Sequence, residues 1–115
     1  MKKNLLVIDD DIDGSTLIKN HYSKKAYKVD TAPTLEEGIA KINEQVPDIL
    51  FLDHHLPDGL GWAMAAKMQR TFPKMRIVLL TAFDAPPYPV ANNDSDFTRL
   101  EKPFSLEKLD SIFDE

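Results

Sequence analysis

The chain has no cysteine, only four glycines and no long apolar run. The lack of cysteine excludes disulfide bonds and thiolate metal sites, and it is typical of proteins of the reducing cytosol. Gly59 and Gly61 are too few for a phosphate-cradling loop and are interpreted as turn residues. The first apolar run stops after four residues at Asp9, which is too short for a signal peptide or a membrane span. We therefore expect a soluble, cytoplasmic protein with no membrane contact.

Basic residues are also scarce, with 14 Lys and Arg against 19 Asp and Glu, for a formal net charge of −5. Nucleic-acid binding needs a basic face, so we expect no direct nucleic-acid binding by this domain. The 115 residues are 43% hydrophobic, which is enough for one core and leaves no room for a second. We expect a single domain over residues 1–115, with any output domain outside this chain.

Short apolar runs recur along the chain and predict β-strands. Residues 4–8, 48–52 and 76–80 are apolar nearly throughout, as expected for strands that are buried on both faces of a parallel sheet. Two weaker strand candidates are residues 28–32 and 97–101.

Helical patterns separate these runs. The first has Leu17, Ile18 and Tyr22 at helical spacing. The others are expected after the capping-type residue Thr34, over residues 60–72, and over residues 105–113 with Ser105 as the N-cap. This alternation of strands and helices predicts an α/β fold with an open, doubly wound, five-stranded parallel sheet.

One segment departs from the alternation. Three prolines fall within residues 85–89, where a helix should follow the fourth strand, and proline is tolerated only in the first turn of a helix. Residues 90–95 then leave room for about one or two helical turns before the fifth strand. We expect an irregular or shortened fourth helix in the segment 85–95.

Polar residues follow the predicted strands at the edge where the strands end. In doubly wound sheets, functional groups gather at this carboxyl edge. The residues placed there are Asp9, Asp10 and Asp11 after the first strand, Asp53 after the third, Thr81 at the end of the fourth and Lys102 after the fifth.

This set of side chains has a definite chemistry. Clustered carboxylates repel one another unless a cation lies among them, and hard oxygen ligands favour Mg²⁺. Such a cation would help one carboxylate to attack phosphorus and form an aspartyl phosphate. Lys102 would pair with phosphoryl oxygens, and Thr81 would donate a hydrogen bond to them.

The sequence resembles the receiver domains of two-component response regulators over essentially its whole length. The matching motifs, in chain order, are Val7-Ile8-Asp9-Asp10-Asp11, Pro47-Asp48-Ile49-Leu50-Phe51-Leu52-Asp53, Leu56-Pro57, Gly61, Thr81-Ala82 and Leu100-Glu101-Lys102-Pro103-Phe104. Each motif alone is weak, but all of them in this order are strongly specific. The resemblance implies a flavodoxin-like receiver fold that acts as a phosphorylation switch rather than as a turnover enzyme.

The resemblance also implies a role for each site residue. Asp53 would be the phosphoacceptor, with the phosphohistidine of a sensor histidine kinase or phosphotransfer protein as donor. Mg²⁺ would be bound by Asp10, by Asp53 and by the backbone carbonyl of His55, with Asp9 acting mainly through water. Thr81 and Lys102 would contact the phosphoryl group. A downstream effector protein would then be a further partner.

Three features depart from the family pattern. Arg99 occupies the position, three residues before the lysine, where receivers usually carry an aromatic residue that reports phosphorylation. Phe97 is on the same strand face by the period of two. Leu60 replaces the usual acidic residue before Gly61, and the proline-rich segment 85–95 replaces a regular helix. We hypothesise that phosphorylation is kept while signal transmission follows another route.

Two alternatives remain open at the sequence level. One is a receiver-like protein-interaction module that is not phosphorylated, for which Arg99 and the proline-rich segment are the main support. The other is a haloacid-dehalogenase-type phosphohydrolase with Asp11 as nucleophile. Against it, Asp11 lies past the strand end, where an acidic residue favours the dipole of the following helix. The adjacent His54 and His55 are interpreted as surface or loop residues, because neighbouring side chains point in different directions.

Overall fold

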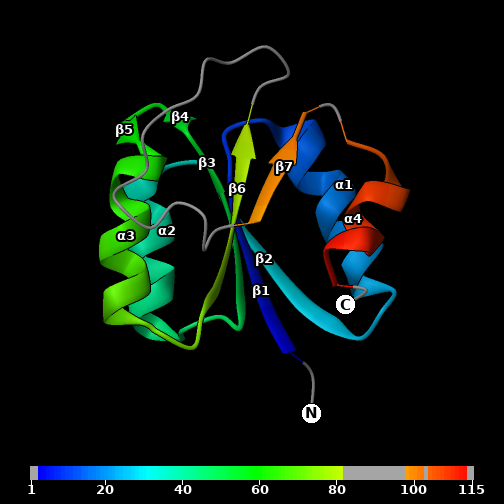
Figure 1. Ribbon diagram of the computed structural model, residues 1–115, viewed down its shortest axis with the longest axis horizontal. Helices are drawn as coiled ribbons and strands as arrows, with labels where there is room; N and C mark the ends of the chain where they lie inside the picture. The colour runs from blue at the N-terminus through cyan, green and yellow to red at the C-terminus, as the bar shows by residue number, and fades with distance from the viewer. Residues whose placement is uncertain (1–2, 82–97, 103, 114–115) are drawn as a thin grey trace.

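The computed structural model describes residues 3–81, 98–102 and 104–113. Its main sheet has five parallel strands in the order β2-β1-β3-β6-β7 (Figure 1). The predicted five-stranded parallel sheet is therefore confirmed, and the predicted strand ends differ from the observed ones by at most one residue. The strands are β1 (Lys3–Ile8), β2 (Tyr27–Ala32), β3 (Ile49–Asp53), β6 (Arg76–Thr81) and β7 (Thr98–Glu101).

Helices cover both faces of the sheet. In Figure 1, α2 and α3 lie on one face and α1 and α4 on the other, which is the doubly wound arrangement. The expected fourth helix in the segment 85–95, together with Phe97, lies outside the described residues. The helices are α1 (Ile12–Ser23), α2 (Leu35–Glu44), α3 (Gly61–Thr71) and α4 (Leu106–Phe113).

Short polar side chains begin two of the helices as predicted. The Thr34 hydroxyl accepts a hydrogen bond from the backbone N–H of Glu37 at 3.1 Å, and the Ser105 hydroxyl accepts one from Lys108 at 3.2 Å. Each bond satisfies a backbone donor that has no partner inside its helix.

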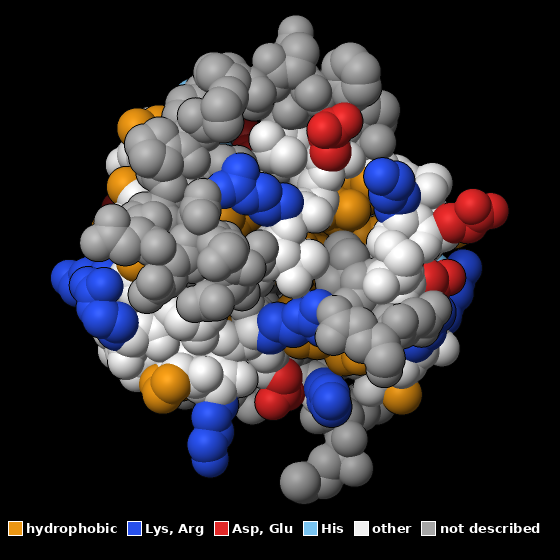
Figure 2. All heavy atoms as spheres, viewed as in Figure 1, with side chains coloured by type: hydrophobic (Ala, Val, Ile, Leu, Met, Phe, Trp, Pro, Cys, Tyr) orange, Lys and Arg blue, Asp and Glu red, His pale blue; other side chains and the backbone are white. Residues whose placement is uncertain are grey.

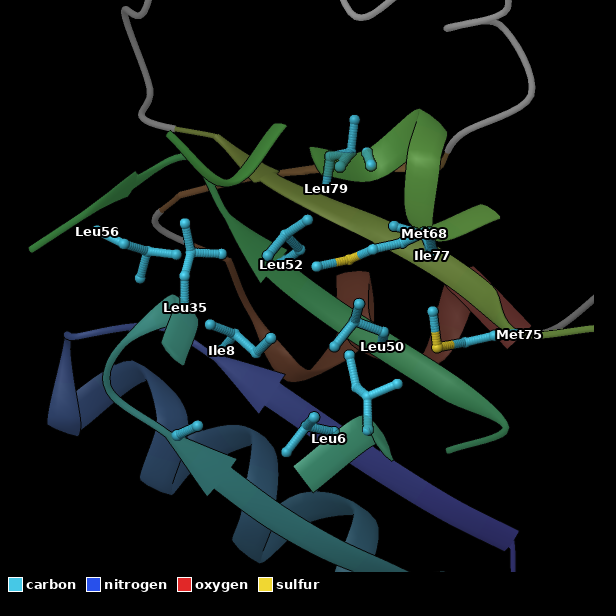
Figure 3. Close-up of a cluster of buried hydrophobic side chains, with 13 residues drawn as sticks. Leu6, Ile8, Leu35, Leu50, Leu52, Leu56, Met68, Met75, Ile77 and Leu79 are labelled. Carbon is cyan, nitrogen blue, oxygen red and sulfur yellow. The ribbon is translucent and has the colours of Figure 1, made fainter. Parts of the chain in front are cut away.

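The sheet divides the core into two layers. Successive side chains of each strand point to opposite faces, so every strand contributes to both layers. Leu6 and Ile8 of β1 pack toward α2 and α3, in the cluster drawn in Figure 3. Leu5 and Val7 belong to the second cluster, on the side of α1 and α4. The apolar runs are nearly continuous because both faces of each strand are buried.

Helix α1 packs against the sheet and against α4. Ile18 and Tyr22 are buried as expected, whereas Leu17 is 39% exposed, so the predicted apolar face was too broad. The Tyr22 hydroxyl donates a 2.7 Å hydrogen bond to the carbonyl of Leu109 in α4. Asp110 of α4 adds a 2.6 Å ion pair with Lys25, which lies just after the end of α1.

A small hairpin between β3 and α3 was not predicted. Its strands β4 (His55–Leu56) and β5 (Gly59–Leu60) pair in antiparallel register, with His55 opposite Leu60 and Leu56 opposite Gly59. Gly59 has a φ of +156°, a backbone conformation that favours glycine. Gly59, interpreted from the sequence as a turn residue, is the first residue of β5 and directly follows the two-residue turn at positions 57 and 58. The hairpin begins two residues after Asp53, at the carboxyl edge of the sheet.

The surface carries charges of both signs. Figure 2 shows Lys and Arg side chains scattered over one face, with Asp and Glu between them and no continuous basic patch among the described residues of that face. Within the described part of the chain, no helix combines the length and apolar character that crossing a membrane requires.

Candidate functional site

The candidate site lies at the carboxyl ends of β1 and β3, which are neighbours in the sheet. The connection after β1 leads to α1 on one face, and the connection after β3 leads to α3 on the other (Figure 1). The chain paths therefore diverge between these two strands. This topological switch point is where doubly wound sheets bind ligands, because the diverging connections leave a crevice.

Three carboxylates meet in this crevice. Asp9, Asp10 and Asp53 each offer one oxygen, and these oxygens all lie within 4.8 Å of one another. Asp9 is buried at 3% exposure and Asp53 at 9%, whereas Asp10 is exposed. The Asp9 side chain is oriented by a 3.0 Å hydrogen bond that its Oδ1 accepts from the backbone N–H of Asp11. The sequence prediction that these acids converge is borne out geometrically.

Lys102 reaches the cluster from the end of β7. Its Nζ lies 2.8 Å from Asp9 Oδ2 and 3.5 Å from Asp53 Oδ1. The buried Oδ2 atom of Asp9 has no other hydrogen-bond partner among the described residues, so Lys102 is the group that compensates it. Burial lowers the pKa of Lys102, but the hydrogen bond and charge of Asp9 and the charge of Asp53 outweigh it and raise that pKa above its usual value. Lys102 is therefore positively charged at neutral pH.

Asp53 has an unusual protonation equilibrium in the metal-free protein. Burial and the nearby charge of Asp9 raise the pKa of Asp53 from 3.8 to about 7, against the opposing attraction of Lys102. A carboxylate that is crowded by another carboxylate gains from any added positive charge. The cluster is thus short of cationic charge.

Thr81 lies at the end of β6, where it is half-buried and paired with Glu101 of β7. Its carbonyl accepts a 2.7 Å hydrogen bond from the backbone N–H of Lys102, which fixes the two strand ends together. Because Leu80 pairs with Asp53, Thr81 lies one residue beyond the level of the aspartate on the neighbouring strand. The predicted site residues therefore come from four adjacent strand ends.

His55 is the first residue of β4, and its side chain is exposed. Its neighbour His54 is a loop residue in the bend between β3 and β4, and its side chain is buried at 6% rather than at the surface. Burial lowers the pKa of His54 below its ordinary value, with a further contribution from His55. Among the described residues, the group of possible metal ligands contains no histidine.

Asp11 has a different place from the other acids. It is the N-cap of α1, and its Oδ1 accepts a 3.2 Å hydrogen bond from the backbone N–H of Asp13. It is exposed and lies outside the three-carboxylate group. The helix-capping interpretation of Asp11 is confirmed.

Gly61 has a role that sequence reasoning had assigned only to a turn. Its N–H donates a 2.7 Å hydrogen bond to the carbonyl of His54, and a Cβ at this position would overlap the carbonyl oxygen of Asp53. Glycine is therefore needed for close approach to the backbone of the buried aspartate. The glycine pair around Leu60 was the available signal, but it does not distinguish a turn from a backbone contact.

The residues fit a hard divalent cation. Three carboxylates and one ammonium leave two negative charges when all are ionised, and the ligand atoms are all oxygen. Mg²⁺ binds such oxygens while it keeps several waters, so the exposed position of Asp10 suits it.

The sequence of this chain is similar to those of known proteins. A family model described as the response regulator receiver domain matches residues 5–114. The transcriptional regulatory protein GlrR of Escherichia coli is 28% identical over 113 residues, which cover 97% of this chain and 26% of GlrR. The alkaline phosphatase synthesis transcriptional regulatory protein PhoP of Bacillus subtilis is 36% identical over 87 residues, which cover 73% of this chain and 35% of PhoP. The chain spans about a quarter to a half of such curated relatives, from 26% to 46% of their length.

Solved structures share its fold. The chemotaxis protein CheY4 of Vibrio cholerae has a TM-score of 0.82 at 24% identity, over 97% of this chain and 96% of that chain. A CheY-like response regulator receiver domain protein of Methanospirillum hungatei has a TM-score of 0.80 at 24% identity, over 97% of this chain and 90% of that one. The expected flavodoxin-like receiver fold is thereby confirmed.

Proposed function

Because this chain belongs to the response regulator receiver domain family, we propose that it accepts a phosphoryl group on Asp53 in a Mg²⁺-dependent reaction. The observation that supports this most strongly is the grouping of Asp9, Asp10 and Asp53 within 4.8 Å, with Lys102 beside two of them. Asp53 is the member that lies at the end of the central strand β3.

Each residue has a proposed task at this site. Asp10, Asp53 and the backbone carbonyl of His55 would hold Mg²⁺, and Asp9 would act mainly through water. The ion would supply positive charge that shields the attacking carboxylate from the incoming phosphate. The raised pKa of Asp53 is consistent with this need, because the carboxylate must be ionised to attack.

The transfer step follows from the charges. A carboxylate oxygen of Asp53 forms a bond to phosphorus while the bond between phosphorus and the donor imidazole nitrogen breaks, and the imidazole keeps that electron pair. Lys102, which is held 3.5 Å from Asp53, would pair with the phosphoryl oxygens as negative charge moves onto the site. Thr81 would donate its hydroxyl to another of these oxygens.

The biological setting is proposed on the same basis. The donor would be a sensor histidine kinase or phosphotransfer protein in the cytoplasm, and the phosphorylated domain would act on a downstream effector. Residues 1–115 would form one phosphoacceptor domain that is a switch rather than a turnover enzyme. We propose no direct contact of this domain with nucleic acid.

Signal transmission is the step where this chain departs from its family. Arg99, at the position of the usual aromatic residue, is exposed on β7 opposite Leu79. Together with the proline-rich segment 85–95, it supports the hypothesis that phosphorylation is transmitted by another route. Family-type dimerisation on phosphorylation would contradict that hypothesis.

Intact-mass spectrometry with acetyl phosphate as the phosphodonor tests the proposal. The wild-type chain should gain one phosphoryl group that requires Mg²⁺. Asp53→Asn should abolish this gain, whereas Asp11→Asn should retain it. A requirement for Asp11 would instead favour the phosphohydrolase alternative. No adduct and no Mg²⁺ binding would favour an interaction module that is not phosphorylated.

A further inference from the structure

We propose that Asp58 is a positioning residue for the Mg²⁺ site, because it fastens the β4–β5 hairpin to the N-terminus of α2. The hairpin begins with His55, whose backbone carbonyl is one of the proposed metal ligands. The inference therefore rests on the proposed function and adds a residue that touches neither the metal nor the phosphoryl group.

Two hydrogen bonds carry the fastening. Asp58 Oδ1 accepts from the backbone N–H of Leu35 at 2.8 Å, and Oδ2 accepts from Glu36 at 2.9 Å. These are the first two N–H groups of α2, which have no partner within the helix. The hydrogen bonds from Glu36 and Leu35 also lower the pKa of Asp58, so its carboxylate stays charged. A negative charge at this position interacts favourably with the positive end of the helix dipole.

The cap is unusual because it comes from a distant segment. Thr34, the residue before α2, caps the helix locally through the N–H of Glu37. Asp58 satisfies the two preceding N–H groups from 23 residues further along the chain. A local cap stabilises the helix alone, whereas a distant cap also fixes the segment that provides it.

Apolar contacts also join the hairpin to α2. Leu56 of the hairpin and Leu35 of α2 belong to one buried cluster, and Figure 3 shows their side chains side by side. A Cβ at Gly59 would lie 3.0 Å from Leu35 Cδ1, so the turn fits closely against that leucine. The hairpin is therefore attached to α2 by both its polar tip and its apolar strand.

The entry to α2 also contacts the other side of the site. The carbonyl of Ala32, just before α2, accepts a 3.0 Å hydrogen bond from the backbone N–H of Asp9.

The hairpin is also joined to the start of α3, because the backbone N–H of Gly61 donates a 2.7 Å hydrogen bond to the carbonyl of His54. Residues 32–36 thus connect the β1 end, which bears two of the carboxylates, with the segment that bears His55. Loss of Asp58 should loosen one side of the metal site relative to the other.

The experiment measures Mg²⁺ affinity and phosphorylation by acetyl phosphate in the full chain. Asp58→Ala should weaken Mg²⁺ binding by about tenfold, the lower end of losses on removing residues that orient metal ligands. Asp58→Asn, which keeps one acceptor oxygen, should fall between Asp58→Ala and the wild type. At saturating Mg²⁺, the phosphorylation rate of both variants should approach that of the wild type.

Thr34→Ala is the matched control, because it removes a cap from the same helix without touching the hairpin. It should lower stability to urea while leaving Mg²⁺ affinity within about twofold of wild type, since the metal site keeps its geometry. If Asp58→Ala does not fold, the comparison of Asp58→Asn with Thr34→Ala decides the question.

Equal Mg²⁺ affinities in the Asp58 and Thr34 variants would overturn the inference, because they would reduce Asp58 to a helix cap. In that case the wild type would still bind Mg²⁺ and be phosphorylated, so the proposed function would stand. Absence of Mg²⁺ binding in the wild type would contradict the proposed function and the inference together.

Discussion

Single residues set the charge balance of the site. Asp9 and Asp53 are buried carboxylates in a position where only one described cation, Lys102, contacts them. Buried charges are costly unless they are paired, and removing one partner leaves the other uncompensated. The consequences of altering this balance can be measured without the donor kinase.

Lys102→Met should keep the fold but lower its stability by about 1–3 kcal/mol, less than for a fully buried pair because the lysine side chain is 24% exposed. It should also slow phosphorylation by about a hundredfold, because a positive charge near the developing phosphoryl charge is lost. Urea unfolding and intact-mass kinetics measure the two effects. Lys108 is an exposed lysine of α4, so Lys108→Met should change neither the stability nor the phosphorylation rate. Unaltered kinetics in Lys102→Met would contradict the role given to the lysine.

Asp53 should make the metal-free protein sensitive to pH. Its folded-state pKa, about 7, lies above its ordinary value of 3.8, so the folded state binds this proton more tightly than the unfolded state. The resulting stability is fully present below about pH 4 and is lost as pH rises through about 7. Urea unfolding without Mg²⁺ should therefore show a stability contribution from Asp53 that falls between about pH 4 and pH 7.

Asp53→Asn is the control for this pH dependence, because it cannot ionise. It should be more stable than the wild type at about pH 8 without metal and should flatten the profile. Mg²⁺ should stabilise the wild type at this pH by balancing the charge of its carboxylates, and so remove the stability difference between the two proteins. A wild-type profile that matches that of Asp53→Asn would show that another group controls the pH response.

At the level of elements, helix ends connect the sequence to the site. Thr34, Ser105 and Asp11 each cap the helix that follows, as their residue types predict. Helix α3 differs, because its N-cap is Leu60, which makes no side-chain hydrogen bond and is 51% exposed. The absence of the usual acidic residue therefore leaves α3 without a side-chain cap.

Leu60→Asn should stabilise the protein by about 1 kcal/mol relative to Leu60→Ala, because Asn can accept a hydrogen bond from an early N–H of α3. The extended backbone of Leu60, with φ −100° and ψ 106°, suits an N-cap residue. Asn adds no charge to the nearby carboxylates, so the comparison isolates the cap. Thermal and urea unfolding measure it, and equal stability of the two variants would contradict the expectation.

The whole molecule is held by two layers of side chains on one sheet. Gly38 lies in the middle of α2, where a Cβ would overlap Ile8 Cδ1 in the cluster of Figure 3. This glycine lets the helix approach β1, the strand that Asp9 follows. Helix propensity and tertiary packing therefore make opposite demands at this position.

Gly38→Ala should destabilise the protein by about 1–3 kcal/mol through overpacking, although the same change in an exposed helix is stabilising by about 1 kcal/mol. A double-mutant cycle with Ile8→Ala should show a favourable coupling, because the smaller side chain gives the new methyl group space. Denaturant unfolding of the four proteins measures the coupling. Strict additivity would show that the overlap is relieved by another movement.

The sequence by itself determined the fold class, the order of the main elements and the acids of the site. Nearly continuous apolar runs require strands that are buried on both faces, and parallel strands bring their carboxyl ends to one edge. Asp53 and Lys102 could therefore be placed together although they are far apart along the chain. The caps at Thr34 and Ser105 were predictable for a related reason, since they depend on neighbouring residues only.

The tertiary structure decided what depends on contacts between distant segments. Sequence patterns could not reveal the β4–β5 hairpin, because each of its strands has only two residues and shows no periodicity. The same holds for Asp58, which looks like an ordinary turn residue until α2 is placed beside it. Burial of His54 and the raised pKa of Asp53 also arise only when the strands are assembled, because desolvation and charge proximity depend on position in space.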